Sequence, residues 1–360
     1  PIYPSSTYRV AFPGDESGYV YSRWSNPTRN AVERAMATLE GGTDAYLFSS
    51  GLGALNAILN LLHSGDHIIA VDDLYGGSIR QFEKIWSKFG LEFTYIDGTN
   101  PENFSKALKS NTKLFWVETP TNPLLKLVDI EAVSKIAKSK NILLAVDNTF
   151  ATPFIQRPLE LGADIVHHSA SKYLSGHCDI IAGVVVVKDD KLAERVFFNQ
   201  YAIGSHLNPF ESWLLLRGLK TLHIRMERHS VNAMKLAEYL ETVDLVDKIY
   251  FPGHDGSAIP NKMAMPGGML SFTLKADFET VKAFVMATEI FILAESLGGV
   301  ESLINHPASM THASIPKELR EKRGISDSLV RLSVGIENVD DLLIDLRRAL
   351  EAIRVKVKKV

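Results

Sequence analysis

Short apolar runs alternate with amphipathic stretches between residues 45 and 190. The runs are bounded by glycine, proline or polar residues, a pattern that predicts strands. The predicted strands are Ala45–Phe48, His67–Val71, Glu92–Ile96, Lys113–Val117, Ile142–Val146, Asp164–His167 and Ala182–Val187. Helical spacing of apolar residues predicts helices at Gly53–Leu62, Ser78–Phe89, Phe104–Lys109 and Ile130–Ser139. This alternation is typical of an α/β fold with a mostly parallel central sheet and helices on both faces.

The two ends of the chain lack this alternation. Residues 1–26 are rich in turn formers and predict an extended N-terminal arm. A helix follows, because Asn26-Pro27 is a start signal and Gly41-Gly42 is a stop signal. We therefore predict a large domain over residues 27–220.

The remaining residues, 221–360, predict a smaller C-terminal α/β domain. A long helical region, interrupted only at Gly218, leads into it from Pro209 to Leu240. The domain itself is expected to contain a strand and two helices, at Met269–Leu274, Phe278–Met286 and Asp340–Ile353.

Composition excludes several classes of protein. The chain is 46% hydrophobic and 22% charged, a balance typical of a globular protein, and its net charge of −3 gives no reason to expect nucleic acid or a membrane surface as a partner. The longest apolar run, Ile180–Val187, is too short to span a bilayer. Because Cys178 is the single cysteine, no intrachain disulfide can form, and we expect a cytoplasmic protein.

Residues that could bind a phosphate, and a lysine that could react with a carbonyl, follow two of the predicted strands. In an open parallel sheet, ligands bind beyond the carboxyl ends of the strands. Gly51 and Leu52 lie at a strand-to-helix turn, where backbone amides can bind a phosphate, although a simple tight turn has the same pattern. Ser169, Ser171 and Lys172 follow the sixth strand. A desolvated lysine reacts with carbonyls, whereas most lysines are simply solvated.

Three further strand ends carry groups with a chemical use. Asp147 follows a fully apolar strand, so its carboxylate is expected to face a cation or a protonated ring nitrogen, unless it only caps a turn. Tyr75 lies on a turn and can stack on an aromatic ligand, or can be an ordinary surface tyrosine. Asn122 lies in a loop stiffened by two prolines. Together these groups predict a site for pyridoxal 5'-phosphate (PLP), which needs an amine, a carboxylate and a phosphate cradle.

Three other interpretations compete with PLP. Gly51-Leu52-Gly53 and Asp72 partly match a dinucleotide-binding dehydrogenase, but Asn56 occupies the position of the third glycine. A metal site would draw on His167, His168, His177, Cys178 and Asp179. Their spacing does not match a zinc pattern, so we predict no metal. A non-catalytic binding protein is the third interpretation.

Eight motifs show a resemblance to a known family. They are YSRWSNPT (21–28), SSGLGA (49–54), DLYGG (73–77), ETPTNP (118–123), VDNTFATP (146–153), SASKYLSGH (169–177), LAESLGGVESLINHPASMTHA (293–313) and RLSVGIE (331–337). In this order, the chain resembles the Cys/Met-metabolism branch of PLP-dependent enzymes, which has the aspartate-aminotransferase fold (PLP fold type I). The similarity is strongest to the cystathionine γ-synthases and γ-lyases.

The resemblance implies a role for each group around the cofactor. Lys172 would bind PLP covalently and move protons, Asp147 would pair with the pyridine nitrogen, and Tyr75 would stack on the ring and assist proton transfer. The implied phosphate ligands are the amides of Gly51 and Leu52, the hydroxyls of Ser169 and Ser171, and Tyr21 and Arg23 from the neighbouring subunit. The active unit would then be a homodimer, with a tetramer as a dimer of dimers.

The resemblance also implies the substrate contacts. Arg331 would bind the α-carboxylate of an amino-acid substrate with help from Ser296, Asn122 would contact both cofactor and substrate, and Glu295 would meet the distal amino group of cystathionine.

The implied reaction is elimination or replacement at the γ-carbon. A γ-synthase joins an O-acylhomoserine to cysteine, and a γ-lyase cleaves cystathionine to cysteine, 2-oxobutanoate and ammonia; the motifs fit both. Methionine γ-lyase is less favoured because the turn Tyr75–Ser78 lacks that group's usual cysteine. O-acylhomoserine sulfhydrylase is less favoured because those enzymes usually differ over residues 294–299.

Overall fold

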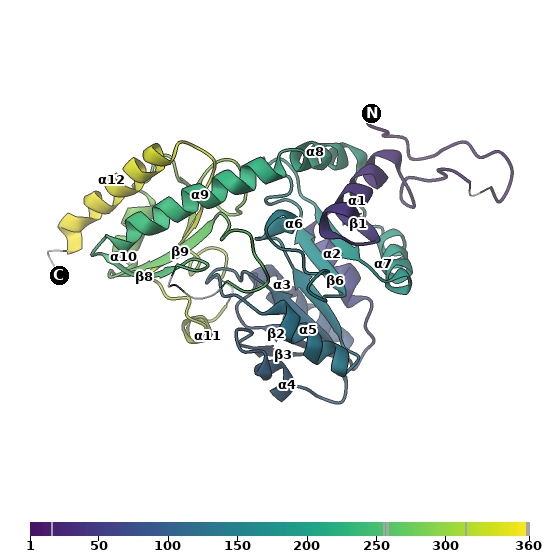
Figure 1. Ribbon diagram of the computed structural model, residues 1–360, viewed down its shortest axis with the longest axis horizontal. Helices are drawn as coiled ribbons and strands as arrows, with labels where there is room; N and C mark the ends of the chain where they lie inside the picture. Colours follow the sequence, from purple (N-terminus) through teal and green to yellow (C-terminus); the bar gives the residue numbers. More distant parts are fainter. Residues whose placement is uncertain (16, 255, 257–258, 314, 358–360) are drawn as a thin grey trace.

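Two β-sheets organise the chain (Figure 1). The computed structural model describes all residues except 16, 255, 257–258, 314 and 358–360. The strands of the large sheet are β1 (Asp44–Phe48), β2 (His67–Val71), β3 (Glu92–Ile96), β4 (Thr112–Glu118), β5 (Leu143–Asp147), β6 (Ile165–Ser169) and β7 (Gly183–Val187). They lie in the order β1-β7-β6-β5-β4-β2-β3, in which only β7 runs opposite to its neighbours. The predicted mostly parallel sheet is therefore confirmed.

Helices cover both faces of the large sheet. They are α1 (Pro27–Glu40), α2 (Gly51–Leu59), α3 (Gly76–Lys84), the 3-10 helix η1 (Trp86–Phe89), α4 (Glu102–Lys106), α5 (Ile130–Ser139), α6 (Thr152–Ile155), α7 (Asp190–Ile203) and α8 (Pro209–Leu219). Along β7, Val185 and Val187 belong to the core that contains α2 and α7, and Val184 and Val186 to the core that contains α1 and α8. Successive side chains of a strand point to opposite faces, so one short apolar run serves both cores.

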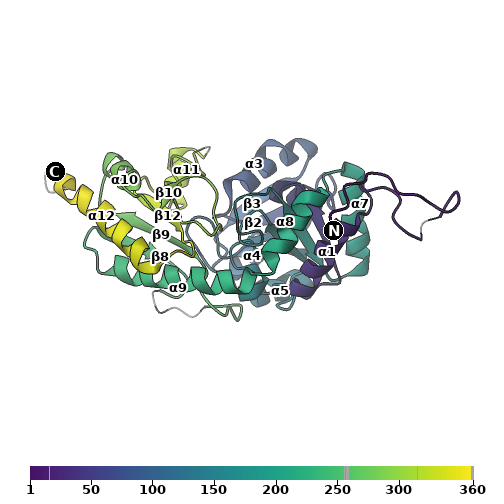
Figure 2. The same cartoon turned by 90° about the horizontal axis from the view of Figure 1, so that it is seen from above.

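The smaller sheet has its own core. Its strands are β8 (Val246–Tyr250), β9 (Met269–Leu274), β10 (Ile292–Leu293), β11 (Leu303–Asn305) and β12 (Leu329–Ser333), in the order β10-β11-β12-β9-β8. Its helices are α9 (Leu222–Glu241), α10 (Phe278–Val285), α11 (Lys317–Lys322) and α12 (Val339–Val357). Figure 2 shows α9 running from the large sheet to the small one. No helix in the described part of the chain is long and apolar enough to cross a membrane.

The structure corrects the long helical region expected from Pro209 to Leu240. It is two helices, α8 and α9, separated after Leu219. A Cβ atom at Gly218 would lie 2.3 Å from the carbonyl oxygen of Ser175, so the end of α8 packs directly against backbone. Arg225 donates to the Gly218 carbonyl at 2.9 Å and so provides a hydrogen-bond partner for one of the last carbonyls of α8.

Other boundaries also differ from the predictions. Helix α2 begins at Gly51 rather than Gly53, because Ser50 caps it by accepting from the Gly53 amide at 2.9 Å. It ends at Leu59 rather than Leu62. The helix predicted over Ser78–Phe89 is divided into α3 and η1. The elements that were not predicted are helices α6, α7 and α11 and strands β8, β10, β11 and β12.

The N-terminal arm leaves the body of the molecule (Figure 1). It folds back on itself at one isolated bridge, between Thr7 and Tyr21. Asn26 ends it by accepting from the amides of Thr28 and Arg29, which starts α1 as the sequence predicts. Large apolar side chains of the arm are exposed, with Phe12 at 61% and Trp24 at 50%.

Strand β7 meets the start of α2 at a close backbone contact. A Cβ atom at Gly183 would lie 2.1 Å from the carbonyl oxygen of Ser50, the N-cap of α2. We expect Gly183→Ala to destabilise the fold by about 1–3 kcal/mol because β7 or α2 must shift. The melting temperature should fall by about 2–4 °C per kcal/mol. Gly18→Ala is the matched control, since nothing lies within 4 Å of its added methyl group. Equal melting temperatures for the two variants would contradict this packing.

Candidate active site

A cavity of about 630 Å³ opens at the carboxyl ends of the large-sheet strands and is closed on its other side by the segment after β10 and by β12. The predicted site residues that line it are Gly51, Leu52, Tyr75, Asn122, Asp147, Ser169, Ser171, Lys172, Glu295, Ser296 and Arg331. The fold thus brings together residues that are more than 250 positions apart in the chain.

One end of the cavity is built from the start of α2. The first amides of a helix have no partner within the helix, so those of Gly51 and Leu52 are available to an anion. A Cβ atom at Gly51 would lie 2.9 Å from the Cβ of Ser169, so only glycine lets this turn approach β6 so closely. The Ser171 hydroxyl accepts from the Ala182 amide at 2.9 Å, which fixes the loop after β6. This end suits a phosphate group.

Asp147 lies in the middle of a row of three titratable residues on adjacent strands. In the parallel register, Glu118 of β4 pairs with Asp147 of β5, and Asp147 pairs with His167 of β6. One Asp147 oxygen accepts from the Thr149 amide at 3.0 Å, and the other lies 3.0 Å from His167 Nδ1.

The pKa values of this row follow from burial and from the neighbouring charges. Burial by itself raises the pKa of Asp147, but His167 and the hydrogen bonds from Thr149 outweigh burial and hold the pKa below its usual value. Asp147 therefore stays ionised. Burial lowers the pKa of His167, but the attraction of Asp147 prevails and the net shift is upward.

Glu118 is a site residue that the sequence analysis did not assign. It is buried, and it accepts from the backbone amide of Tyr75 at 2.9 Å. Burial, and then the charge of Asp147, raise the pKa of Glu118 well above its usual range. Its position directly after a buried strand is the same signal that identified Asp147, and could have found it.

Lys172 lies on the loop after β6, with its amine inside the cavity. Its Nζ donates to the hydroxyl of Ser296 at 2.6 Å. Burial, and then the nearby charge of Arg331, lower the pKa of Lys172 to about 8. A substantial fraction of this amine is therefore neutral and nucleophilic near neutral pH.

Arg331 is presented by β12 and is 1% exposed. Its Nη1 donates to Asn122 at 2.7 Å and its Nη2 donates to the Ser296 carbonyl at 3.0 Å. Its Nε is buried without a hydrogen-bond partner among the described residues. An unpaired buried N–H is costly, so this guanidinium suits an incoming carboxylate.

Two predicted residues lie elsewhere. Within the described chain, Tyr21 and Arg23 do not line this cavity. They belong to the arm, where Tyr21 is 45% exposed and Arg23 donates to the Tyr201 carbonyl at 2.8 Å.

The structure also separates the residues behind the competing interpretations. His167 faces Asp147, whereas His168 points to the other side of the sheet and contacts Glu40 at 2.6 Å. Asp72, the acidic residue of the dinucleotide pattern, forms an ion pair with Lys126 at 3.1 Å. Among the described residues, no three histidine, cysteine, aspartate or glutamate side chains are arranged so that they could hold a metal ion.

The cavity residues fit PLP. Glycine at position 51 lets the start of α2 lie against Ser169, so the first amides of α2 and the Ser169 hydroxyl reach the same end of the cavity. Asp147 offers an ionised carboxylate for the pyridine nitrogen, and Lys172 offers an amine of lowered pKa for the aldehyde.

Comparisons with known proteins agree with this chemistry. The family model described as Cys/Met metabolism PLP-dependent enzyme matches residues 1–351. A protein named cystathionine beta-lyase from Lactococcus lactis subsp. cremoris (strain MG1363) is 53% identical, over 98% of this chain and 93% of its own length. One named cystathionine gamma-lyase from Bacillus subtilis (strain 168) is 48% identical, over 98% of this chain and 94% of its own length.

A solved structure shows the same architecture. It is the cystathionine gamma synthase from Xanthomonas oryzae pv. oryzae in complex with cystathionine, which is 43% identical over 99% of this chain and 93% of that chain, with a TM-score of 0.94. The match at full length covers both sheets and the residues that line the cavity. This chain belongs to the Cys/Met metabolism PLP-dependent enzymes.

Proposed function

We propose that this enzyme cleaves cystathionine by elimination at the γ-carbon, releasing cysteine, 2-oxobutanoate and ammonia. The observation that carries the proposal is the grouping of Lys172, Ser296 and Arg331, in which a proton-moving amine and a carboxylate-binding guanidinium both contact one serine. An amino acid held by Arg331 would have its reacting carbons close to Lys172.

The cofactor provides the electron sink. When bound, PLP withdraws electrons from the α-carbon of the substrate and stabilises the negative charge that forms there. The proposed cofactor ligands within this subunit are Lys172 for the aldehyde, Asp147 for the pyridine nitrogen, Tyr75 for the ring face, Asn122 for the phenolic oxygen, and Gly51, Leu52, Ser169 and Ser171 for the phosphate. Glu118 accepts from the backbone amide of Tyr75 and so fixes the backbone position from which the Tyr75 side chain extends.

Lys172 is the proposed proton carrier. Its pKa of about 8 allows the amine both to accept and to release a proton near neutral pH. Its Nζ donates to the Ser296 hydroxyl at 2.6 Å, so the amine lies beside the residue whose carbonyl contacts Arg331. Elimination at the γ-carbon requires proton removal from two adjacent carbons, and one amine on a flexible four-carbon side chain can reach both.

Two residues of opposite charge are proposed to select the substrate. Arg331 binds the α-carboxylate, and Glu295 lines the same cavity and attracts the distal ammonium group. Cystathionine has an amino-acid group at each end, so it satisfies both. Its thioether links those two ends and contains the bond that the reaction breaks.

The γ-replacement reaction is the second candidate. It joins an O-acylhomoserine to cysteine and would use the same residues. The similarity to a solved cystathionine gamma synthase favours it over candidates of another class.

We also propose that a second copy of the chain completes the site. Among the described residues that line the cavity, Lys172 and Arg331 are the only lysine or arginine. Lys172 is assigned to the aldehyde, and Arg331 is bonded to Asn122 and Ser296. The phosphate end therefore has neutral ligands only. Arg23 of a neighbouring arm would supply the missing positive charge, and Tyr21 of the same arm would add a hydroxyl donor. A dimer is the smallest such assembly, and a tetramer would be two dimers. The expected cytoplasmic location stays a prediction.

The reaction products test the proposed function. Incubation of the holoenzyme with cystathionine alone should release cysteine and 2-oxobutanoate, measured by chromatography of the derivatised products. Pyruvate and homocysteine would instead show cleavage at the β-carbon. Activity only with an O-acylhomoserine plus cysteine would show the synthase. Lys172→Ala should fold normally but lose turnover, and a wild-type rate in that variant would exclude the proposed mechanism.

The lowered pKa of Lys172 predicts how cofactor binding depends on pH. The neutral amine is the reactive form, so covalent binding of PLP to cofactor-free enzyme should speed up as pH rises through about 8 and then level off. Stopped-flow absorbance of the bound cofactor measures this rate. Lys172→Ala provides the non-covalent baseline. A rate that keeps increasing beyond pH 10 would mean that Lys172 has an ordinary pKa.

Replacement of Arg331 tests carboxylate binding. Arg331→Lys keeps the charge but loses the planar fork, so we expect KM for cystathionine to rise about 10- to 100-fold with a smaller change in kcat. Steady-state kinetics separate the two constants. Arg354→Lys, at an exposed position of α12, is the control. An unchanged KM in Arg331→Lys would place the carboxylate elsewhere.

A further inference from the structure

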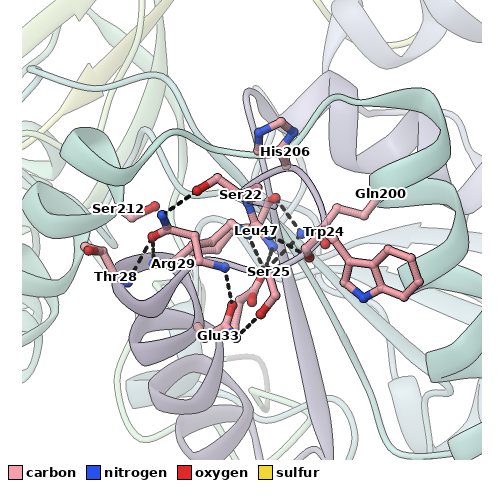
Figure 3. Close-up of polar contacts among 12 residues, drawn as sticks. Ser22, Trp24, Ser25, Thr28, Arg29, Glu33, Leu47, Gln200, His206 and Ser212 are labelled. Carbon is pink, nitrogen blue, oxygen red and sulfur yellow. Dashed lines mark hydrogen bonds and ion pairs between the residues drawn. The ribbon is translucent and has the colours of Figure 1, made fainter. Parts of the chain in front are cut away.

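A buried arginine holds the turn that joins the arm to α1 (Figure 3). Arg29 is 1% exposed. Its Nη1 donates to the Ser22 carbonyl at 2.8 Å, and its Nη2 donates to the carbonyls of Trp24 at 2.8 Å and Arg23 at 3.4 Å. One guanidinium therefore binds three successive carbonyls, a pattern that no other side chain can reproduce with a single fork.

Glu33 connects this guanidinium to the large sheet. Its carboxylate lies 3.4 Å from Arg29 Nε, one turn earlier on α1. The same oxygen accepts from the Leu47 amide of β1 at 3.0 Å and from the Gln200 side chain of α7 at 2.9 Å. Figure 3 shows Glu33 below Arg29 and Leu47 in the view. The turn is thus tied through Arg29 and Glu33 to a strand and a helix of the rigid body.

The outer side of the turn is fixed as well. The Trp24 ring stacks on Tyr201 of α7, with centroids 5.0 Å apart and planes 7° apart. Arg23 donates to the Tyr201 carbonyl at 2.8 Å. Tyr21 and Arg23 nevertheless remain exposed, so the turn is rigid in its backbone while its side chains stay available to another molecule.

We propose that Arg29, held by Glu33, is a positioning residue for the active site of a second copy of the chain. By fixing the carbonyls of residues 22–24, it sets the direction in which Tyr21 and Arg23 reach the partner's PLP phosphate. The inference rests on the proposed function, in which the arm completes the neighbouring site. Arg29 itself touches neither substrate nor cofactor.

A purely structural role for Arg29 makes a different prediction. If Arg29 only stabilised its own subunit, its replacement would damage the site of the chain that carries it. If Arg29 positions the arm, the damage appears in the site of the other chain. Mixed oligomers distinguish the two cases.

The experiment uses Arg29→Lys, which keeps the charge facing Glu33 but loses the fork. We expect the PLP dissociation constant of the variant to rise at least about tenfold, since two or more hydrogen bonds to a charged group are lost. Equilibrium dialysis with free PLP measures it. Arg34→Lys, exposed on the same helix, should leave the constant unchanged.

Complementation then locates the effect. Arg29→Lys and Lys172→Ala chains carrying different tags are co-expressed, and the mixed oligomer is isolated through both tags. The Arg29→Lys chain keeps Lys172 and receives an intact arm. Its site should therefore bind PLP with wild-type affinity, fixed on Lys172 by borohydride, and about half of the wild-type turnover should return. Weak binding in this mixed oligomer would overturn the inference.

A second mixed oligomer distinguishes failure of this inference from failure of the proposed function. Arg23→Ala mixed with Lys172→Ala tests whether the arm acts across subunits at all. Recovery in this pair without recovery in the Arg29→Lys pair overturns the role of Arg29 alone. Recovery in neither pair overturns the shared site itself. If Arg29→Lys does not fold, Arg29→Met combined with Glu33→Gln removes both buried charges together and takes its place in the same mixing experiment.

Discussion

The active site depends on the parallel register of three strands, β4, β5 and β6. That register places Glu118, Asp147 and His167 side by side, in the buried region at the carboxyl ends of these central strands. Three titratable groups cannot all be charged in so small and dry a space without mutual compensation. His167 compensates Asp147, which stays ionised, while the pKa of Glu118 rises. The sheet itself thus provides one ionised carboxylate inside the cavity, which is the charge that the proposed contact with a pyridine nitrogen requires.

The second constraint is that the site forms only where the two sheets meet. Arg331 comes from β12 and binds Asn122, which lies in the loop after β4. Next to it, Ser271 of β9 donates to the Pro123 carbonyl at 2.7 Å. Arg331 is therefore oriented by a loop of the large sheet although it belongs to the small one. If Arg331 binds the substrate as proposed, its orientation depends on how the two sheets pack together.

The strands of the large sheet, and the site residues that directly follow them, could be predicted from local sequence, whereas Arg331, Ser296 and Glu295 were expected only from the family resemblance. A strand that ends in Asp147, and another followed by Ser169 and Lys172, are signals that spacing alone provides. The register between strands is not encoded locally, because it depends on which strands become neighbours. Local sequence therefore indicates neither Glu118 nor His167 as a neighbour of Asp147. The break between α8 and α9 was also missed, since it results from contact with Ser175, some 40 residues earlier. The proposed roles of Tyr21 and Arg23 rest on the family resemblance, because the sequence pattern of one chain does not indicate contacts with a second copy.

At Ser296 the backbone conformation and the side-chain contact favour different residues. Its backbone has a φ of 83°, a left-handed conformation that favours glycine. Yet its hydroxyl accepts from Lys172, and glycine would abolish that contact. Alanine would keep the strain and lose the hydroxyl, and threonine would add β-branching to an unfavourable backbone. Serine is the smallest side chain that offers a hydroxyl to Lys172. Smaller residues at this position would lose the hydrogen bond, and bulkier ones would increase the backbone strain.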